Sequence, residues 1–419
     1  MSDPVVSPAD VSILRTLVTR VRDIAYSEQN LERKERWLNH NALRPGKPMV
    51  IAELGGLGSN GELPVEPLLV CRDPWARNME RGLRSTIYQF DHIKDDWVVE
   101  PFLQCNWAVD MGNYGVEARH QSGSHDGVMG SYVWEPPLKN LKEDLTKLKQ
   151  RQFSVDREGT LASKSHMETL FGDILPVRIR GNFWWTMGMT IDAIGLIGLE
   201  QLMLYMVDDP EGLHQLMKFL HDDHMALATW LEKENLLSLN NENDYIGSGS
   251  VGYSDELPAP DFSGHVRFCD LWCLSESQET VGVGPEMFQE FIFPYQKSIV
   301  ERFGLSYYGC CEPVNNRWHV VKQINNLRKV SVSPWCDEAF MARELGSRYV
   351  YCRKPNPTQV STDRFDENAI REDLATTIRH TRQHGCILEL VMKDVHTVQR
   401  QPERLARWVQ LARETAEKA

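Results

Sequence analysis

Three adjacent residues, Cys310, Cys311 and Glu312, combine side-chain types that bind metal ions. Thiolates and carboxylates are common zinc ligands, and a zinc site needs three or four of them. The three residues follow the apolar run LSYYG, which is typical of a buried strand. Because side chains alternate along an extended chain, Cys310 and Glu312 are expected to point one way and Cys311 the other. Cys310 and Glu312 are therefore candidate zinc ligands from one strand end.

A third zinc ligand would have to come from another strand. Cys386, at the start of the segment GCILELVM, is the first candidate, and Cys336 is the second. Adjacent cysteines without a C-x-x-C spacing form a weak motif. The competing interpretation is that the two adjacent cysteines are small core residues and that Glu312 is a surface residue.

Acid and base candidates follow other apolar runs of the C-terminal half. Lys393 and Asp394 come directly after ILELVM, where they could form an acid/base unit or a structural ion pair. Glu276 and Glu279 lie in the polar stretch SESQET as further proton-transfer candidates. Acidic residues at the start of a helix would explain these two glutamates equally well.

A group of residues at predicted strand ends is expected to contact a substrate. Cationic side chains there could bind an anionic group, unless they are solvated loop charges. Tryptophan rings could pack against a flat substrate, although such aromatic walls more often belong to a core. The candidates are the aromatic residues Trp184, Trp185 and Trp335, the cations Arg353 and Lys354, and Asp270.

The elements that must position these residues alternate along the chain. From about residue 97, apolar runs typical of strands are separated by amphipathic segments typical of helices, a pattern that requires parallel pairing. Roughly eight such units favour a closed (β/α)8 TIM barrel over an open doubly wound sheet, with the active site at the carboxyl ends of the strands. The open sheet is the alternative, but no strand is followed by a glycine-rich dinucleotide turn.

Two segments stand outside this alternation. Residues 1–95 read as an N-terminal, α-rich extension or cap, which leaves 96–419 as the α/β barrel domain. A Gly-, His- and Ser-rich stretch holds His120 and His125. It could act as a lid or a metal-binding segment, or it could be an exposed loop.

Composition limits the possible partners and the compartment. The net charge of −13, without a dense basic run, argues against nucleic acid and against an anionic membrane surface. No apolar stretch reaches the roughly 18 residues that a membrane span needs, and the N-terminus lacks a secretory signal pattern. The nine cysteines are an odd number, which suits free thiols in a reducing compartment. A cytoplasmic protein is therefore expected.

The stretch ESQETVGVGPEMFQEFIFPYQKSIVERFG resembles the uroporphyrinogen decarboxylase superfamily, in which a Gly-Pro, an aromatic residue and a Pro-Tyr lead through a helix into the next strand. The tail KDVHTVQRQPERLARWV is similar to the family's closing strand, turn and helix. The resemblance extends over roughly residues 97–415 and implies the (β/α)8 barrel. The superfamily includes the decarboxylase, zinc- and corrinoid-dependent methyltransferases and, more distantly, cobalamin-independent methionine synthase.

The resemblance also implies a metal site. In the methyltransferase branch one strand ends in His-x-Cys-Gly, and these two residues bind zinc together with a later cysteine. Alignment of LSYYGCCEP places Cys310 at the histidine and Glu312 at the first cysteine, with Cys386 at the second. A shift of one or two residues would make Cys311 a ligand instead. The arginine-rich N-terminal signature of the decarboxylase branch is absent, which disfavours decarboxylation of uroporphyrinogen.

The leading expectation is a zinc-dependent methyltransferase. It would move a methyl group from a small methoxylated or methylated substrate to a corrinoid (cobalamin) carried by a partner protein, and it could form a homodimer. Zn²⁺ would act as a Lewis acid, with Glu276 or Asp394 handling the proton. One alternative is a metal-free decarboxylase or lyase of a small carboxylated substrate that uses Arg353, Lys354 and Lys393. Another is a non-catalytic barrel that binds a corrinoid or a small ligand.

Overall fold

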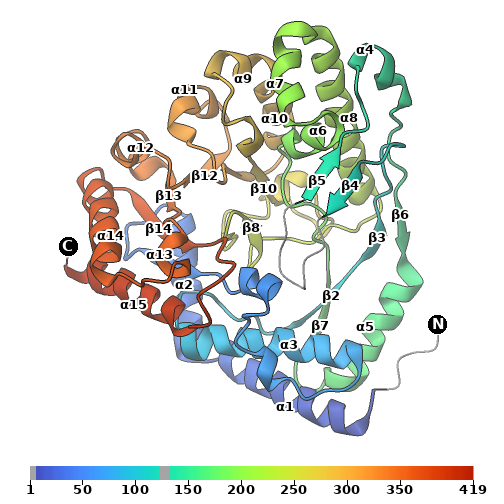
Figure 1. Ribbon diagram of the computed structural model, residues 1–419. Coiled ribbons are helices and arrows are strands. Elements are labelled where there is room, and N and C mark those ends of the chain that lie inside the picture. The colour runs from blue at the N-terminus through green and yellow to red at the C-terminus, as the bar shows by residue number, and fades with distance from the viewer. Residues whose placement is uncertain (1–5, 123–131, 419) are drawn as a thin grey trace.

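The largest sheet consists of six parallel strands, as Figure 1 shows. The computed structural model describes residues 6–122 and 132–418. Nearly every residue of these strands is buried, which is typical of a parallel sheet covered on both faces. In sheet order the strands are β1 (Met49–Ala52), β14 (Ile387–Met392), β13 (Val350–Arg353), β12 (Leu327–Val332), β11 (Leu305–Tyr308) and β10 (Trp272–Ser275).

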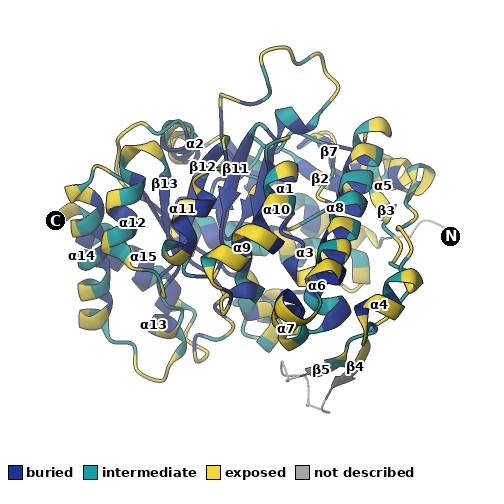
Figure 2. Ribbon diagram, turned by 90° about the horizontal axis from the view of Figure 1, so that it is seen from above, coloured by how far each residue is buried: buried dark blue, intermediate teal, exposed yellow. Residues whose placement is uncertain are grey.

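Helices connect the parallel strands from β10 to β14 and continue after the last one. Figure 2 shows that their outer faces are exposed and that the strands between them are buried. This arrangement confirms the predicted α/β class, because parallel neighbours need a crossover connection. The helices are α9 (Pro285–Phe291), α10 (Phe293–Val300), α11 (Trp318–Val321), α12 (Glu338–Leu345), α13 (Thr358–Ser361), α14 (Glu367–Gln383) and α15 (Glu403–Lys418).

The remaining strands form four two-stranded sheets, of which only β2 with β7 is parallel. They are β2 (Leu103–Asn106) with β7 (Val177–Arg180), β3 (Ala108–Asp110) with β6 (Ser154–Asp156), β4 (Arg119–Ser122) with β5 (Tyr132–Glu135), and β8 (Tyr245–Gly247) with β9 (Ser250–Val251). The other α-helices are α1 (Pro8–Ala25), α2 (Glu28–Asn41), α3 (Pro74–Tyr88), α4 (Leu141–Asp144), α5 (Arg157–Phe171), α6 (Thr190–Ile197), α7 (Leu199–Asp208) and α8 (Pro210–Lys233).

Short helical turns complete the elements. One is a π turn at Gln89–Ile93. The 3-10 turns are Gly55–Asn60, Glu66–Leu68, Leu145–Lys147, Phe268–Asp270, Gln278–Thr280, Val314–Arg317 and Gly346–Arg348. The turn at Gln278–Thr280 follows β10 and the one at Val314–Arg317 follows β11, so both lie close to the carboxyl edge of the sheet.

Irregular segments link the two outer strands of the six-stranded sheet. The backbone N–H of Asp96 donates to the Val50 carbonyl on β1 at 2.8 Å. The Asn243 amide in turn donates to the Val98 carbonyl at 2.5 Å. Beside β10, the Asn240 side chain accepts from the Trp272 N–H at 2.8 Å and donates to its carbonyl at 3.1 Å. Backbone and side-chain hydrogen bonds of these segments thus connect β1 with β10, and the described strands do not show a closed eight-stranded barrel.

The N-terminal segment is part of the sheet, which corrects the expected boundary at residue 95. β1 pairs in parallel with β14 from Met49 to Ala52. Trp37 of α2 is fully buried, and it packs in the same apolar cluster as Trp272 and Tyr307. The division into a cap of 1–95 and a barrel of 96–419 therefore does not match the packing.

Beneath this cluster, three buried ionisable groups form a network. The Lys329 ammonium lies 3.1 Å from one carboxylate oxygen of Glu389, and Nε2 of His40 lies 3.1 Å from the same oxygen. Burial opposes the charge on Glu389, but Lys329 and His40 lower the pKa of this carboxyl well below its usual range. The lysine also lies over the rings of Trp37 and Trp272. Ionic contacts therefore tie α2 to β12 and β14.

Helices α6, α7 and α8 pack against one another beside the sheet. At the start of α8 the Asp209 carboxylate caps the N–H of Gly212, and Pro210 occupies the first turn. No single helix of the described chain is long and apolar enough to cross a bilayer. α6 and α7 meet the length and composition criteria only as a pair, and a 91° bend separates them.

Candidate functional site

A glycine turn at the end of β11 presents the predicted thiols. Gly309 has a φ of +96°, and a Cβ there would lie 2.9 Å from a methyl carbon of Val314, so the position suits only glycine. The turn ends the strand alternation, and the sulfurs of Cys310 and Cys311 lie 3.6 Å apart. The expectation that these two side chains point in opposite directions is therefore wrong.

Lys393 and Asp394 follow β14 and meet the two thiols that follow β11. In the sheet, β13 and β12 lie between these two strands. The Lys393 ammonium lies 2.6 Å from the Asp394 carboxylate and 3.7 Å from the Cys310 sulfur. Asp394 in turn lies 3.8 Å from the sulfur of Cys311. We call these four residues the thiol–lysine cluster. In this cluster the residues that follow β11 meet those that follow β14.

The two thiols of the cluster differ in acidity. The Cys310 thiol is buried, and both its hydrogen bond to Cys311 and its burial raise its pKa. The hydrogen bond with Cys310 and the nearby Lys393 ammonium lower the pKa of Cys311, against the opposing effects of burial and of the Asp394 carboxylate. Burial disfavours the charged form of Lys393, but Cys310 and Asp394 raise its pKa. Cys311, which is exposed, is therefore the more acidic thiol of the pair.

Glu276 and Glu312 form a buried carboxyl pair beside the cluster. Burial and the neighbouring carboxyls of Glu312 and Glu279 raise the pKa of Glu276 well above its usual range. One oxygen of Glu276 accepts from the Gln278 N–H at 3.0 Å, and the other has no partner among the described residues. A neutral carboxylic acid with a free oxygen is suited to donate a proton.

Glu312 braces two loops. One of its oxygens accepts from the Ser277 N–H at 2.9 Å and the other from the Cys310 N–H at 2.8 Å. These bonds tie the loop after β11 to the loop after β10. Both oxygens of Glu312 therefore hold backbone N–H groups, which fixes this carboxylate between the two loops.

The predicted third ligand lies at the opposite edge of the sheet. Cys386 precedes β14, whereas Cys310 follows β11, and these strands are parallel. The Cys386 thiol donates to the Ala342 carbonyl on α12 at 3.3 Å. The alternate ligand Cys336 packs 4.0 Å from the carbonyl oxygen of Glu312, behind the loop. The predicted ligands Cys310, Glu312 and Cys386 therefore do not share one site.

The described residues, 6–122 and 132–418, also offer no other set of side chains that fits zinc. Within these ranges no group of three or more His, Cys, Asp or Glu side chains is arranged to hold a metal ion. A zinc site needs at least three protein ligands. His125 lies outside the described residues, and of the neighbouring His120 only the backbone pairing in β4 is described.

Two of the expected substrate contacts lie away from the cluster. Asp270 precedes β10 instead of following it and accepts hydrogen bonds from Arg267 and from the Ala259 N–H. Arg353 points outward from β13, where its guanidinium pairs with Glu338 at 2.8 Å. Both expectations were wrong, because the apolar run continues after Asp270 and because strand alternation turns Arg353 towards the helices.

Lys354 and Trp335 lie closer to the cluster. The buried Lys354 ammonium is 2.5 Å from the sulfur of Cys352 and lies over the Tyr307 ring. Burial raises the pKa of the Cys352 thiol to about 12. Trp335 is 68% exposed and lines a surface depression together with Cys311 and Glu279. Lys354 is thus an internal residue, and Trp335 is the candidate contact at the surface.

Two residues of the site escaped the sequence analysis. Glu53 follows β1, and its backbone N–H donates to the Met392 carbonyl, which places it beside Lys393. Burial raises the pKa of its carboxyl, against the effect of Lys393, and one of its oxygens has no partner among the described residues. Tyr245 of β8 lies next to Glu53; burial and that carboxyl raise its pKa. The apolar run MVIA, which forms β1, directly precedes Glu53, and it is the one feature of the sequence that could have indicated a strand end there.

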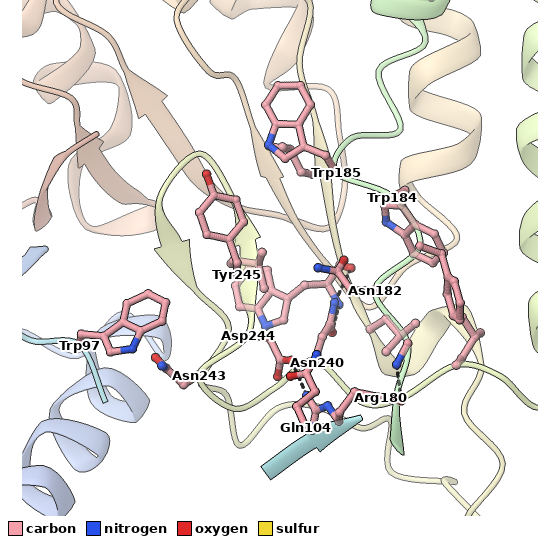
Figure 3. A pocket seen from close by; sticks show the side chains of 18 residues that line it. Trp97, Gln104, Arg180, Asn182, Trp184, Trp185, Asn240, Asn243, Asp244 and Tyr245 are labelled. Atoms are coloured by element: carbon pink, nitrogen blue, oxygen red, sulfur yellow. Dashed lines mark hydrogen bonds and ion pairs between the residues drawn. The ribbon is translucent and has the colours of Figure 1, made fainter. Parts of the chain in front are cut away.

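Trp184 and Trp185 line a separate cavity of about 230 Å³, shown in Figure 3. Trp97, Trp272 and Tyr245 line it as well. Tyr245 connects this cavity to the thiol–lysine cluster, since its hydroxyl is close enough to Glu53, Lys393 and Cys310 for their charges to affect its pKa. The two tryptophans named by the sequence therefore share a cavity with Tyr245 and are not part of the cluster itself.

Comparison with known proteins gives one structural resemblance. The chain is similar to a methyltransferase from Methanosarcina mazei, with a TM-score of 0.49 and 10% sequence identity over 91% of this chain and 98% of the other. No family model matches the sequence, and no curated protein matches it. At this identity the resemblance concerns the backbone arrangement and leaves the chemistry of this chain to its own residues.

Proposed function

We propose that this chain is a methyltransferase in which the thiolate of Cys311 receives a methyl group from a small methoxylated or methylated donor. The observation that supports this most is the exposed Cys311 sulfur, whose pKa is lowered beside Cys310 and Lys393. A thiolate is the nucleophilic form of cysteine. The resemblance of roughly residues 97–415 to the superfamily that includes the zinc- and corrinoid-dependent methyltransferases supports the same class of reaction.

The proposed step uses groups of the site alone. The Cys311 sulfur attacks the methyl carbon, and the bond from that carbon to the donor oxygen or sulfur breaks. The leaving atom takes the proton of Glu276, whose raised pKa keeps it a neutral acid. The products are S-methyl-Cys311 and the demethylated donor. Lys393 keeps Cys311 ionised before the attack.

A corrinoid carried by a partner protein is the proposed final acceptor, as the resemblance implies. The corrinoid would supply the acceptor for the methyl group of S-methyl-Cys311, and release of that group would restore the Cys311 thiolate. The proposed steps are written without zinc, because Cys310, Glu312 and Cys386 do not meet and the described residues offer no other group of three ligands. Of the three cations that the decarboxylase alternative uses, Arg353 is engaged by Glu338 and Asp373.

The test is methylation of the cysteine itself. The protein is incubated with methanol, 2-methoxyphenol or dimethyl sulfide, with and without cob(I)alamin, and the peptide containing Cys310 and Cys311 is analysed by mass spectrometry. We expect one methyl group on this peptide for the wild type and none for Cys311→Ser. Cys269→Ser, which changes a thiol at the other edge, is the matched control. The absence of both methylated peptide and methylcobalamin with every donor would refute the proposal.

A further inference from the structure

A second cavity lies at the amino edge of the sheet, opposite the edge that carries the thiol–lysine cluster. It has a volume of about 510 Å³, which is in the range of sites that bind small organic molecules. Strands β1 and β14 begin at this cavity, where α2 and α15 pack against β1 and α14 packs against α15, as Figure 1 shows. Neither Cys311 nor Glu276 lines it, so it is separate from the proposed reaction centre.

The lining of this cavity carries more positive than negative charge. Its cations come from three helices and from the segment before β1, and they are Arg36, Lys47, Arg382 and Arg413. Glu417 is the single acidic residue among the described residues of the lining. Its side chain is 67% exposed, and its carboxylate lies 3.9 Å from the Lys47 ammonium. A cavity in which one sign of charge prevails attracts ligands of the opposite sign.

A buried carboxylate holds two of these arginines in place. One oxygen of Asp96 accepts from Arg36 at 2.8 Å and from Arg413 at 3.0 Å, and its other oxygen accepts from the Val50 N–H at 2.8 Å. Arg413 makes no further hydrogen bond to a residue that the structure describes. One carboxylate therefore serves two guanidinium groups, and Arg413 keeps N–H groups that a ligand can use.

Two further arginines add to the excess of positive charge. Arg382, which is exposed, donates to the Ala416 carbonyl at 2.7 Å and has no carboxylate partner among the described residues. Arg33, three residues before Arg36 on α2, is 3% exposed, and one of its terminal nitrogens has no partner within the described chain. Burial lowers the pKa of Arg33, and the charges of Arg413 and Arg36 lower it further, against the effect of two nearby carboxylates. An anion would relieve this repulsion between cations.

The inner surface of the cavity is apolar. Val50 of β1, Leu388 of β14 and Ile378 of α14 line it, and all three side chains are buried. A small inorganic anion would meet the arginines but would leave this surface and most of the volume unused. A ligand with an apolar body in addition to its charge would cover these side chains and remove them from water.

We propose that this cavity binds an anionic amphiphile, a small molecule with one carboxylate or phosphate group and an apolar body of about eight carbons. The guanidinium groups of Arg382 and Arg413 hold the anionic group, because guanidinium binds both carboxylate and phosphate through paired hydrogen bonds. Val50, Ile378 and Leu388 contact the apolar body. The site is independent of the proposed methyl transfer, since it lies at the other edge of the sheet.

The experiment is isothermal titration calorimetry of the full-length protein with octanoate and with octyl phosphate at neutral pH. We expect saturable binding that Arg413→Gln and Arg382→Gln each weaken at least about tenfold, because each removes a charged hydrogen-bond donor. Arg379→Gln, one turn earlier on α14 and outside the cavity, is the matched control and should leave the affinity unchanged. Glu417→Gln should tighten binding about twofold, since it removes the acidic side chain of the lining. Thermal melting confirms that each variant is folded.

Three comparison ligands separate the charge from the apolar body. Octanol has no charge, octylammonium has a positive charge, and inorganic phosphate has no apolar body. Weaker binding of all three than of octanoate or octyl phosphate supports the proposal, and the tighter of these two anions identifies the preferred anionic group. Equal or tighter binding of any of the three, absence of saturable binding of both anions, or equal affinities in Arg413→Gln and Arg379→Gln would each overturn it. None of these measurements needs a methyl donor, so failure of the proposed function would leave them unchanged.

Discussion

The ammonium of Lys393 lies 3.7 Å from the sulfur of Cys310, although 83 residues separate them in the sequence. The lysine reaches this position from the end of β14 and the cysteine from the end of β11. Between them they make Cys311 the more acidic thiol, because Cys310 supplies the hydrogen bond and Lys393 the positive charge.

The first prediction concerns that acidity. Lys393→Met removes the cation next to the thiols, so we expect the pKa of Cys311 to rise and its thiolate to form only at higher pH. The rate of alkylation of Cys311 by iodoacetamide, followed across pH by peptide mass spectrometry, measures the shift. Lys297→Met, on α10, is the control. A pH profile that is the same in wild type and Lys393→Met would exclude the proposed role of the lysine.

The second prediction concerns the buried carboxyl of Glu276. Its pKa is raised in the folded protein, so its contribution to stability is complete below the pKa of an unfolded glutamate and is lost as pH rises through the folded value. Glu276→Gln stays neutral, and at pH 8 we expect it to unfold with a free energy about 1–3 kcal/mol larger than that of the wild type. Urea unfolding at pH 5 and pH 8 measures this.

The pH dependence provides the control for that measurement. The stability difference between Glu276→Gln and the wild type should shrink from pH 8 to pH 5, while methyl transfer is lost at both. A difference that is the same at the two pH values would show that Glu276 is not neutral through burial.

The third prediction concerns the ionic network below the site. Lys329→Met leaves the buried carboxylate of Glu389 without its cation, and we expect a loss of about 3–5 kcal/mol in the free energy of unfolding. Lys218→Met, which breaks an exposed pair with Asp222, should cost less than about 1 kcal/mol. The double variant Lys329→Met/Glu389→Met should recover much of the loss. If it is as unstable as the single variant, the network is held by packing instead of charge.

The fourth prediction tests whether Cys386, at the amino edge of the sheet, takes part in the reaction at the carboxyl edge. Cys386→Ser changes a thiol that bonds to α12 at the far edge, so we expect methyl transfer within about twofold of the wild type. Metal analysis of the same samples should give well below one zinc per chain for the wild type, Cys310→Ala and Cys386→Ser alike. One zinc per chain that disappears in Cys386→Ser would restore the ligand set expected from the family resemblance.

Part of this architecture could be predicted from the sequence because buried parallel strands are continuous apolar runs. The runs that became β11, β12, β13 and β14 were recognised in this way, and Lys393 and Cys310 were named from the residues that follow them. β1 was missed because four apolar residues inside a charged, helical region give a weak signal. Because β1 was not predicted, Glu53, which follows it, was not named as a candidate site residue.

The errors in the site have geometric causes. A position just before a strand and one just after it look alike in a sequence but lie at opposite edges of the sheet, as Cys386 shows. The direction of a side chain after a glycine turn cannot be derived from strand alternation, so the side-by-side placement of Cys310 and Cys311 was not foreseen. Glu312 has the chemistry of a ligand, yet two backbone N–H groups take up its oxygens.

The pairing of β1 with β14 has a consequence for how the protein is made. Most of the chain separates these two neighbours, so β14 cannot find its partner until synthesis is nearly finished. The contact between Glu53 and Lys393 cannot form until Lys393 has emerged from the ribosome. A polypeptide interrupted before β14 would therefore expose the flank of β1 and have only half of its reactive centre.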